Sequence, residues 1–192
     1  LFRSHPALNA RLAALRADPA FMARIRPHLS LSLRHTVADG ALDWVGRPAA
    51  DAPVLREESP LGPLAVPRGS FYQVNPGAAA LLLATVQRWI ADARPRAVVD
   101  LYCGVGVFAL AAAAAGAAPV MGVDSDEAAI ANARLNAAAL GLNCAFQAGP
   151  AQDTTRRVLS SVEAETTLLI VDPPRTGLPP RLVRDVLDRK ST

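Results

Sequence analysis

The stretch V-V-D-L-Y-C-G-V-G-V-F, residues 98–108, decides the fold of this 192-residue chain. Its apolar beginning predicts a buried strand that carries Asp100 near its carboxyl end. Gly104 and Gly106 then allow a tight turn and a close approach of the backbone to a ligand. The apolar, alanine-rich run that continues from Phe108 to Ala115 predicts a helix. The stretch therefore predicts a strand, a turn and a helix of a parallel α/β sheet.

Strands and helices alternate on both sides of this stretch. Asn75-Pro76 is an N-cap residue followed by proline at the first helical position, which predicts the start of a helix. We expect a Rossmann-like, doubly wound parallel α/β sheet. The expected elements are helix 77–91, strand 97–101, helix 108–115, strand 120–123, helix 126–140, strand 145–147, helix 151–161, strand 167–171 and helix 181–189.

The last expected strand, T-L-L-I-V at 167–171, is almost wholly apolar. A parallel strand of this kind needs cover on both faces and a neighbour on each side. The chain also begins at Leu1 instead of methionine. We therefore expect a piece truncated at both ends, with a sheet that is incomplete at its C-terminus.

Residues 1–70 have a different pattern and predict the remnant of a mixed α+β domain that precedes the α/β unit of residues 71–192. Asp39-Gly40 is a hairpin turn signal between two segments of strand character. The expected elements are a helix over 6–26 that breaks at Asp18-Pro19, strands over 29–36 and 41–45, and a short strand around a turn within 61–66.

Composition bounds the class of protein. Hydrophobic residues make up 51% of the chain and charged residues 19%, which excludes intrinsic disorder. Two cysteines exclude a disulfide framework and a four-ligand zinc or iron–sulfur site, and we expect no metal in this chain. The net charge of +3 lies wholly within residues 1–70, as nine arginines against six acids. Such an excess suits contact with phosphate, although an arginine-rich composition alone also explains it.

The longest apolar stretch, residues 97–123, does not predict a membrane span. Asp100, several glycines and Pro119 interrupt it, and most of its apolar residues are alanine. No signal peptide is visible at the beginning of the chain. We expect a cytoplasmic protein with no membrane partner.

Two ligands compete for the glycine turn. Gly104, Gly106 and Ala109 match a dinucleotide fingerprint, and Asp124 follows at the distance of a ribose-binding acid. The carboxylate of Asp100 would, however, repel a pyrophosphate, whereas it would attract the ammonium and sulfonium of S-adenosylmethionine. We favour S-adenosylmethionine. The alternative is that Asp100 only caps the following turn and the glycines only allow close packing.

A second carboxylate motif, D-P-P-R, follows the last expected strand. Asp172 stands at the carboxyl end of that strand, where open α/β sheets bind ligands. Pro173 and Pro174 predict a rigid extended loop that can hold a planar base.

Three motifs in this order resemble those of the RNA 5-methyluridine (uracil-C5) methyltransferases, class I enzymes that use S-adenosylmethionine and act on tRNA or 23S rRNA. The resemblance covers residues 54–192 well and 1–53 weakly. The motifs are F-Y-Q-V-N at 71–75, D-L-Y-C-G-V-G at 100–106 and D-P-P-R-T-G at 172–177. The first is specific to the family, while the second marks the wider superfamily.

The resemblance implies a role for each matching residue. Cofactor contacts would come from Gln73, Tyr102, Asp124 and Asp172, in addition to Asp100, with Gly104 and Gly106 shaping the turn. Phe71, Asn75 and Pro173 would lie near the target base, and Arg175 near RNA or the domain seam. The chain departs from the family at Pro150, where members usually have Asp or Asn for the adenine, so Gln152 or Asp153 would have to substitute. Val107 replaces a residue that is polar in some members.

The resemblance also implies a nucleophile that this chain does not hold. The family uses a cysteine thiolate that adds to uracil C6, and we expect that cysteine beyond Thr192. Neither Cys103 nor Cys144 matches its position, and Cys103 is interpreted as a small packed residue. We therefore assign no catalytic residue within the chain and expect the fragment alone to be inactive. Some members bind an iron–sulfur cluster through cysteines that would precede Leu1.

The stretch L-F-R-S-H-P-A-L-N, at the beginning of the chain, resembles the segment after the last of those cysteines, which favours 23S rRNA over tRNA as substrate. Three other functions stay open: a non-catalytic module that binds RNA or cofactor, a dinucleotide-dependent oxidoreductase, and a methyltransferase of exocyclic amines. The last would need an aromatic residue where Arg175 stands.

Overall fold

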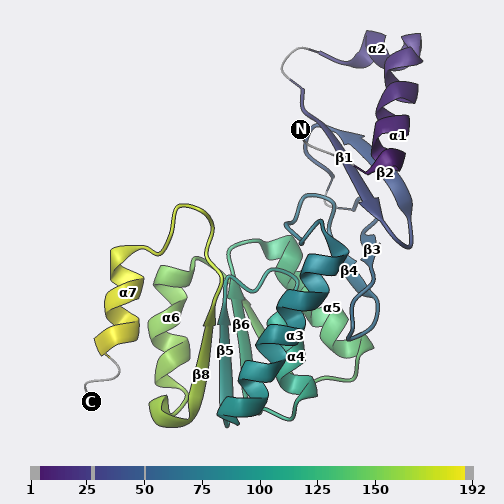
Figure 1. Ribbon diagram of the computed structural model, residues 1–192. Helices are drawn as coiled ribbons and strands as arrows, with labels where there is room; N and C mark the ends of the chain where they lie inside the picture. The colour runs from purple at the N-terminus through teal and green to yellow at the C-terminus, as the bar shows by residue number, and fades with distance from the viewer. Residues whose placement is uncertain (1–4, 27–28, 50, 189–192) are drawn as a thin grey trace.

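The computed structural model describes residues 5–26, 29–49 and 51–188. Its main feature is a parallel sheet of four strands in the order β7-β6-β5-β8 (Figure 1). The strands are β5 (Ala97–Leu101), β6 (Val120–Asp124), β7 (Ala145–Ala148) and β8 (Thr167–Val171). The expected parallel α/β fold is confirmed.

Helices cover both faces of the sheet, as in a doubly wound fold (Figure 1). Val98 of β5 packs in a core with α3, α4 and α5, while Val99 and Leu101 pack with α6 and α7. Successive residues of a strand point to opposite faces, so Asp100 faces the α3–α5 side. The helices are α3 (Pro76–Ala93), α4 (Val107–Ala114), α5 (Glu127–Ala139), α6 (Ala151–Ser160) and α7 (Pro180–Leu187).

The two neighbours of β5 differ in their place in the sheet. All five residues of β5 are buried, because β6 and β8 pair with it on either side. β8 lies at an edge and its residues are only half-buried. Within the described residues, β8 pairs with β5 alone, so its apolar side chains have a neighbouring strand on one side only.

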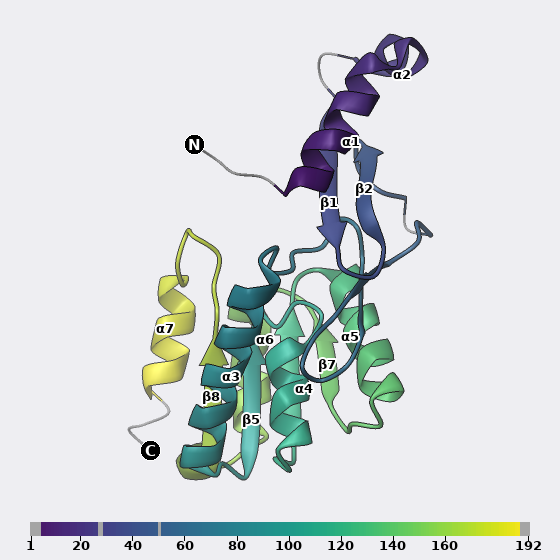
Figure 2. The same ribbon diagram turned by 45° about the vertical axis from the view of Figure 1, so that its right-hand side comes forward.

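The N-terminal elements form a second group. Helix α1 (Pro6–Ala17) lies beside an antiparallel hairpin of β1 (Leu31–Thr36) and β2 (Gly40–Val45), and the short helix α2 (Pro19–Arg24) follows α1. Figure 2 shows this group standing apart from the parallel sheet. The predicted break at Asp18-Pro19 is confirmed, because the Asp18 carboxylate accepts the Ala20 N–H at 2.9 Å and caps α2.

A short hairpin connects the two groups. It pairs β3 (Leu55–Glu57) with β4 (Leu64–Val66). Elsewhere, in the parallel unit, a 3₁₀ turn (Ala164–Thr166) precedes β8. The sequence did not predict β3. Its apolar residue Leu55 packs with β4 in the core of α3–α5, so its stability comes from contacts distant in sequence. The division of the chain at residue 70 stays a prediction.

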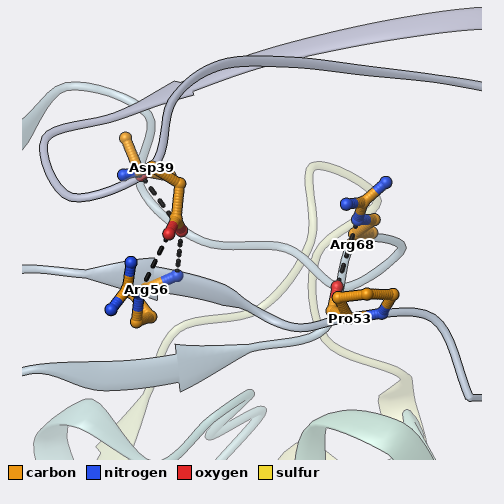
Figure 3. Close-up of polar contacts among 5 residues, drawn as sticks. Asp39, Pro53, Arg56 and Arg68 are labelled. Carbon is orange, nitrogen blue, oxygen red and sulfur yellow. Dashed lines mark hydrogen bonds and ion pairs between the residues drawn. The ribbon is translucent and has the colours of Figure 1, made fainter.

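Polar contacts join the two hairpins and also join the segments that flank the β3–β4 hairpin (Figure 3). The Asp39 carboxylate accepts hydrogen bonds from the backbone N–H and the Nε of Arg56, at 2.7 and 2.9 Å. The Arg56 contacts hold the pKa of Asp39 below its usual range. Nearby, Arg68 Nε donates to the carbonyl of Pro53 at 3.1 Å. The β1–β2 turn is thereby tied to β3.

Asn136 fixes the β3–β4 hairpin to the parallel unit. Its buried side chain accepts the Ala65 N–H at 2.8 Å and donates to the Ala65 carbonyl at 3.1 Å. The same amide nitrogen donates to the carbonyl of Val105, in the glycine turn, at 3.3 Å. One α5 side chain thus satisfies an edge residue of β4 as a neighbouring strand would.

We expect Asn136→Ala to lower the free energy of unfolding by about 2 kcal/mol, because it leaves the half-buried Ala65 peptide groups and the Val105 carbonyl without their Asn136 partner. Urea unfolding followed by circular dichroism measures the change. The matched control is Asn143→Ala at an exposed position, with an expected change within about 0.5 kcal/mol. Equal stabilities of the two variants would show that Asn136 does not anchor the hairpin.

No helix in the described part of the chain combines the length and the apolar character of a membrane span.

Candidate methyl-donor site

Three aspartates gather at the carboxyl edge of the sheet. Asp100 lies near the end of β5, Asp124 ends β6, and Asp172 follows β8 directly. These strands are neighbours, so the structure brings the three predicted carboxylates to one edge. Burial raises the pKa of Asp100 most, and the negative charges of Asp172 and Asp124 raise it further.

Asp100 is fully buried, and only one of its two carboxylate oxygens has a hydrogen-bond partner. Its Oδ2 accepts the N–H of Ala109 in the first turn of α4 at 3.1 Å, so the carboxylate does cap that helix. Its Oδ1 is buried without a hydrogen-bond partner. Burial raises the pKa of Asp100 to about 8, although the hydrogen bond from the Ala109 N–H acts in the opposite direction and lowers it. Capping therefore explains one oxygen and leaves the other without a partner.

The glycine turn has a left-handed backbone at three positions: Tyr102 (φ 66°), Gly104 (φ 53°) and Gly106 (φ 89°). Glycine adopts this conformation without strain, whereas Tyr102 does so against the usual preference of a side chain. Backbone bonds hold the turn against β6, since the N–H groups of Tyr102 and Cys103 both donate to the Val123 carbonyl. Tyr102 is half-buried, and burial followed by the Asp124 charge raises the pKa of its phenol.

The two glycines have different surroundings. A methyl group on Gly104 would meet nothing nearer than the Phe71 carbonyl oxygen at 4.0 Å, so the backbone there is open to a ligand. A methyl group on Gly106 would lie 2.8 Å from Cζ of Phe146. Gly104 therefore leaves room for a ligand, and Gly106 leaves room for the packed ring of Phe146.

Asp124 connects β6 to the glycine turn. Its Oδ2 accepts the Gly104 N–H at 2.8 Å, and its Oδ1 accepts the Asp126 N–H at 2.9 Å. The side chain stays partly exposed. Each carboxylate oxygen has a second lone pair, so Asp124 can still accept hydrogen bonds from a diol.

Segment 71–75 lies beside the glycine turn, since the Phe71 carbonyl oxygen would be 4.0 Å from a methyl group added to Gly104. The Phe71 side chain is 80% exposed, and Gln73 is half-buried. Asn75 is the N-cap of α3, as predicted, since its Oδ1 accepts the Ala78 N–H at 3.1 Å. Residues predicted to meet a cofactor and a base thus flank one glycine turn.

The loop after β8 leaves the same edge of the sheet (Figure 1). The Asp172 N–H donates to the Leu101 carbonyl at 3.5 Å, which holds the start of this loop against the end of β5. Pro173 is half-buried, and Asp172 and Arg175 are exposed. The loop therefore places Asp172 next to the end of β5, and it carries an exposed guanidinium three residues further on.

The neighbourhood of Pro150 bears on adenine recognition. Pro150 is the N-cap residue of α6 without a side-chain hydrogen bond, and Gly149 N–H donates to the Asp124 carbonyl at 2.9 Å. Gln152 is half-buried, while Asp153 is exposed and lies 3.7 Å from Arg181. A role for Gln152 or Asp153 toward adenine stays a prediction.

Both cysteines are poor nucleophiles. Cys103 is buried beside Gly122, and burial followed by the charges of Asp100 and Asp124 strongly raises the pKa of its thiol. Burial raises the pKa of Cys144 to about 11. Since the thiolate is the reactive form, neither side chain is suited to attack a base. Among the described residues, no three His, Cys, Asp or Glu side chains gather as metal ligands would.

Behind the site lies a buried ion pair that the sequence did not indicate. Arg34 of β1 and Glu57 of β3 are in contact, and the Arg34 guanidinium lies over the ring of Tyr72. The alternation L-S-L-R-H-T showed a strand but not that Arg34 faces inward. Such a pairing depends on two hairpins that meet only in the fold.

Comparison with known proteins finds methyltransferases that match most of this chain. The family model for ribosomal protein L11 methyltransferase (PrmA) matches residues 78–165. The 23S rRNA (uracil(747)-C(5))-methyltransferase RlmC of Vibrio vulnificus is 42% identical over 129 residues, which cover 67% of this chain and 33% of the relative. The Pectobacterium atrosepticum enzyme of the same name is 32% identical over 177 residues, 88% of this chain and 45% of the relative.

The chain spans between a third and just under half of these two relatives. A solved structure agrees with them. The Pyrococcus abyssi tRNA (uracil-54, C5)-methyltransferase in complex with S-adenosyl-L-homocysteine matches 78% of this chain and 34% of its own, with a TM-score of 0.56 and 28% identity. Sequence relatives and structure therefore point to the same group, and this chain belongs to the family of RNA uracil-C5 methyltransferases, with the class I methyltransferase fold.

Proposed function

We propose that this chain supplies the S-adenosylmethionine site of an enzyme that methylates C5 of uridine in RNA. The observation that carries the proposal is the open backbone at Gly104, in the turn that follows Asp100, whose buried Oδ1 has no hydrogen-bond partner. The relatives named as 23S rRNA methyltransferases favour 23S rRNA over tRNA as substrate. Methylation of ribosomal RNA implies a cytoplasmic protein.

The donor's chemistry fits the residues present. Its ammonium and sulfonium carry positive charge, which relieves the repulsion among Asp100, Asp124 and Asp172. Its ribose diol suits the remaining lone pairs of Asp124. We assign Gln73 and Tyr102 as further contacts, because both flank the open turn. A dinucleotide fits less well, since its pyrophosphate would add negative charge near those of Asp124 and Asp172, which already raise the pKa of Asp100.

The target base would lie on the side of Phe71. An 80% exposed aromatic ring beside a cofactor site offers a stacking surface for an unpaired base. Asn75 and Pro173 border the same edge, and the exposed Arg175 suits a phosphate. We therefore assign residues 71–192 to donor and base binding and residues 1–70, with their positive excess, to the RNA side.

When bound, the donor supplies the methyl group that is transferred. The residues of this chain hold the donor, orient the base against it and exclude water from the buried Asp100 side. Uracil C5 also needs a thiolate at C6, and Cys103 and Cys144 are both held protonated. We therefore expect the 192-residue chain to bind donor without transferring its methyl group.

Two assays test this function. In isothermal titration calorimetry, the chain should bind S-adenosylhomocysteine and not NADH; the reverse would support the oxidoreductase alternative. In the second assay, labelled S-adenosylmethionine is incubated with unmodified 23S rRNA or tRNA, and 5-methyluridine is detected by mass spectrometry. The product of the complete reading frame should form it in 23S rRNA. Its formation by the 192-residue chain would show that a described cysteine is reactive.

Donor affinity should rise with pH up to about 8. The free chain holds a proton on Asp100 below that pH, because its pKa is raised from 3.8 to about 8. The ammonium group, which S-adenosylmethionine and S-adenosylhomocysteine share, favours the ionised carboxylate, so binding of either ligand must release this proton. Affinity for S-adenosylhomocysteine should fall at least about tenfold from pH 8 to pH 6.

Calorimetry at pH 7 in two buffers of different ionisation enthalpy measures the protons released. We expect up to one proton per S-adenosylhomocysteine bound. Asp100→Asn is the control, because it cannot release a proton and should bind with an affinity independent of pH. Binding by the unmodified chain without proton release would exclude Asp100 from the donor site.

A further inference from the structure

We propose that Arg34, Glu57 and Tyr72 form a clamp that positions segment 71–75 against the glycine turn. The clamp residues come from β1, β3 and the segment itself, so the N-terminal hairpin acts on the site through it. These residues are positioning residues, since none of them lines the open backbone at Gly104. The role rests on the proposed donor site.

The ion pair is short and shielded from water. Arg34 Nε donates to Glu57 Oε1 at 2.9 Å, and Arg34 Nη2 lies 2.8 Å from the same oxygen. The two side chains are 10% and 8% exposed. The Arg34 guanidinium carbon lies 5.6 Å from the centre of the Tyr72 ring, within the range of a cation–π contact.

Tyr72 is the buried anchor of the segment. Its side chain is 7% exposed and packs in the core with Leu55 and Leu64, whereas Phe71 is 80% exposed and Gln73 half-buried. Because Phe71 and Gln73 are its direct chain neighbours, the place of the Tyr72 ring determines where both of them lie. A shift of the ring would move the residues proposed to meet base and donor.

Stability alone does not explain a buried ion pair at this place. Removing two charges from water is costly, and apolar side chains of similar volume often stabilise a fold at least as well. Burial raises the pKa of Glu57 even with Arg34 beside it, so the desolvation cost is real here. What an apolar pair cannot supply is a directed cation over the Tyr72 ring.

The test separates positioning from stability. The double variant Arg34→Met/Glu57→Leu removes both charges and keeps the volume. The control is Arg11→Gln, which breaks an exposed ion pair with Asp43 on the α1 side of the same hairpin. Three quantities are measured: the melting temperature, NMR order parameters of the amides of 71–75, and the Kd for S-adenosylhomocysteine.

The double variant should melt within a few degrees of the unmodified chain. Its order parameters over 71–75 should fall from about 0.85 to below about 0.6, the range of flexible backbone. Its Kd for S-adenosylhomocysteine should rise at least about fivefold. Arg11→Gln should change neither the order parameters of 71–75 nor this Kd. Tyr72→Phe keeps the ring under the guanidinium and should behave as the unmodified chain, whereas Tyr72→Leu should behave as the double variant.

Unchanged order parameters in a folded double variant would overturn the clamp. If the double variant does not fold, Arg34→Lys decides, because it keeps the charge and loses the planar contact; rigid amides over 71–75 in that variant would also overturn the clamp. If the unmodified chain does not bind S-adenosylhomocysteine, the proposed function fails, and the order parameters still test the clamp by themselves.

Discussion

Asp124→Ala is expected to weaken binding of S-adenosylhomocysteine at least about hundredfold, which corresponds to about 3 kcal/mol. The Asp124 carboxylate holds the Gly104 N–H at 2.8 Å and the Asp126 N–H at 2.9 Å. We propose that it also accepts hydrogen bonds from the donor's ribose, and charge-assisted bonds are about twice as strong as neutral ones. The substitution removes the proposed contact with the donor and loosens the turn that faces it.

Calorimetric titration with S-adenosylhomocysteine measures this loss. The control is Asp92→Ala, which changes the net charge equally at an exposed position in the last turn of α3. It should bind as the unmodified chain does. A folded Asp124→Ala variant that binds within threefold of the control would remove Asp124 from the donor site.

Gly106→Ala is expected to lower the free energy of unfolding by about 3 to 4 kcal/mol, the sum of a left-handed backbone and an overpacked core. The new methyl group would lie 2.8 Å from Phe146 Cζ and 3.2 Å from Cβ of Ala133. The ring cannot move away toward β6, because it already lies against Gly122, where an added Cβ would be 2.6 Å from Phe146 Cδ1.

Gly116→Ala isolates the packing effect. Gly116 has nearly the same backbone angle, φ 91° against 89°, and an added methyl group there meets nothing within 4 Å. It should cost about 1 to 2 kcal/mol, the backbone strain alone. Urea unfolding of both variants gives the difference. Equal costs would mean that Phe146 does not confine Gly106, whereas partial rescue by Phe146→Leu would confirm that it does.

The elements that the sequence predicted best are those with strong local patterns. Strands β5 and β8 have the predicted bounds, because each is a short apolar run between polar or turn residues. Strand β3, of three residues, was missed, since its pairing partner β4 and the core that buries Leu55 are formed by other parts of the chain. In β1, alternation predicted a strand, yet the buried positions include the polar Arg34 and Thr36.

The candidate site also has features that the sequence predicted and features that it did not. Its carboxylates were predictable, because the carboxyl ends of neighbouring parallel strands meet at one edge and each aspartate follows an apolar run. It was not predictable that one oxygen of Asp100 has a hydrogen-bond partner and the other has none. This difference depends on the distance from β5 to the first turn of α4 and on burial by three helices.

By itself, the sequence therefore determined the parallel α/β fold, the order of its elements and the family, because apolar period, turn residues and motifs are local properties. Only the tertiary structure decided that Gly104 faces an open space while Gly106 faces Phe146. It also decided that Arg34 and Glu57, 23 residues apart, meet behind Tyr72. These assignments depend on which side chains approach one another across the core, and no local pattern records that.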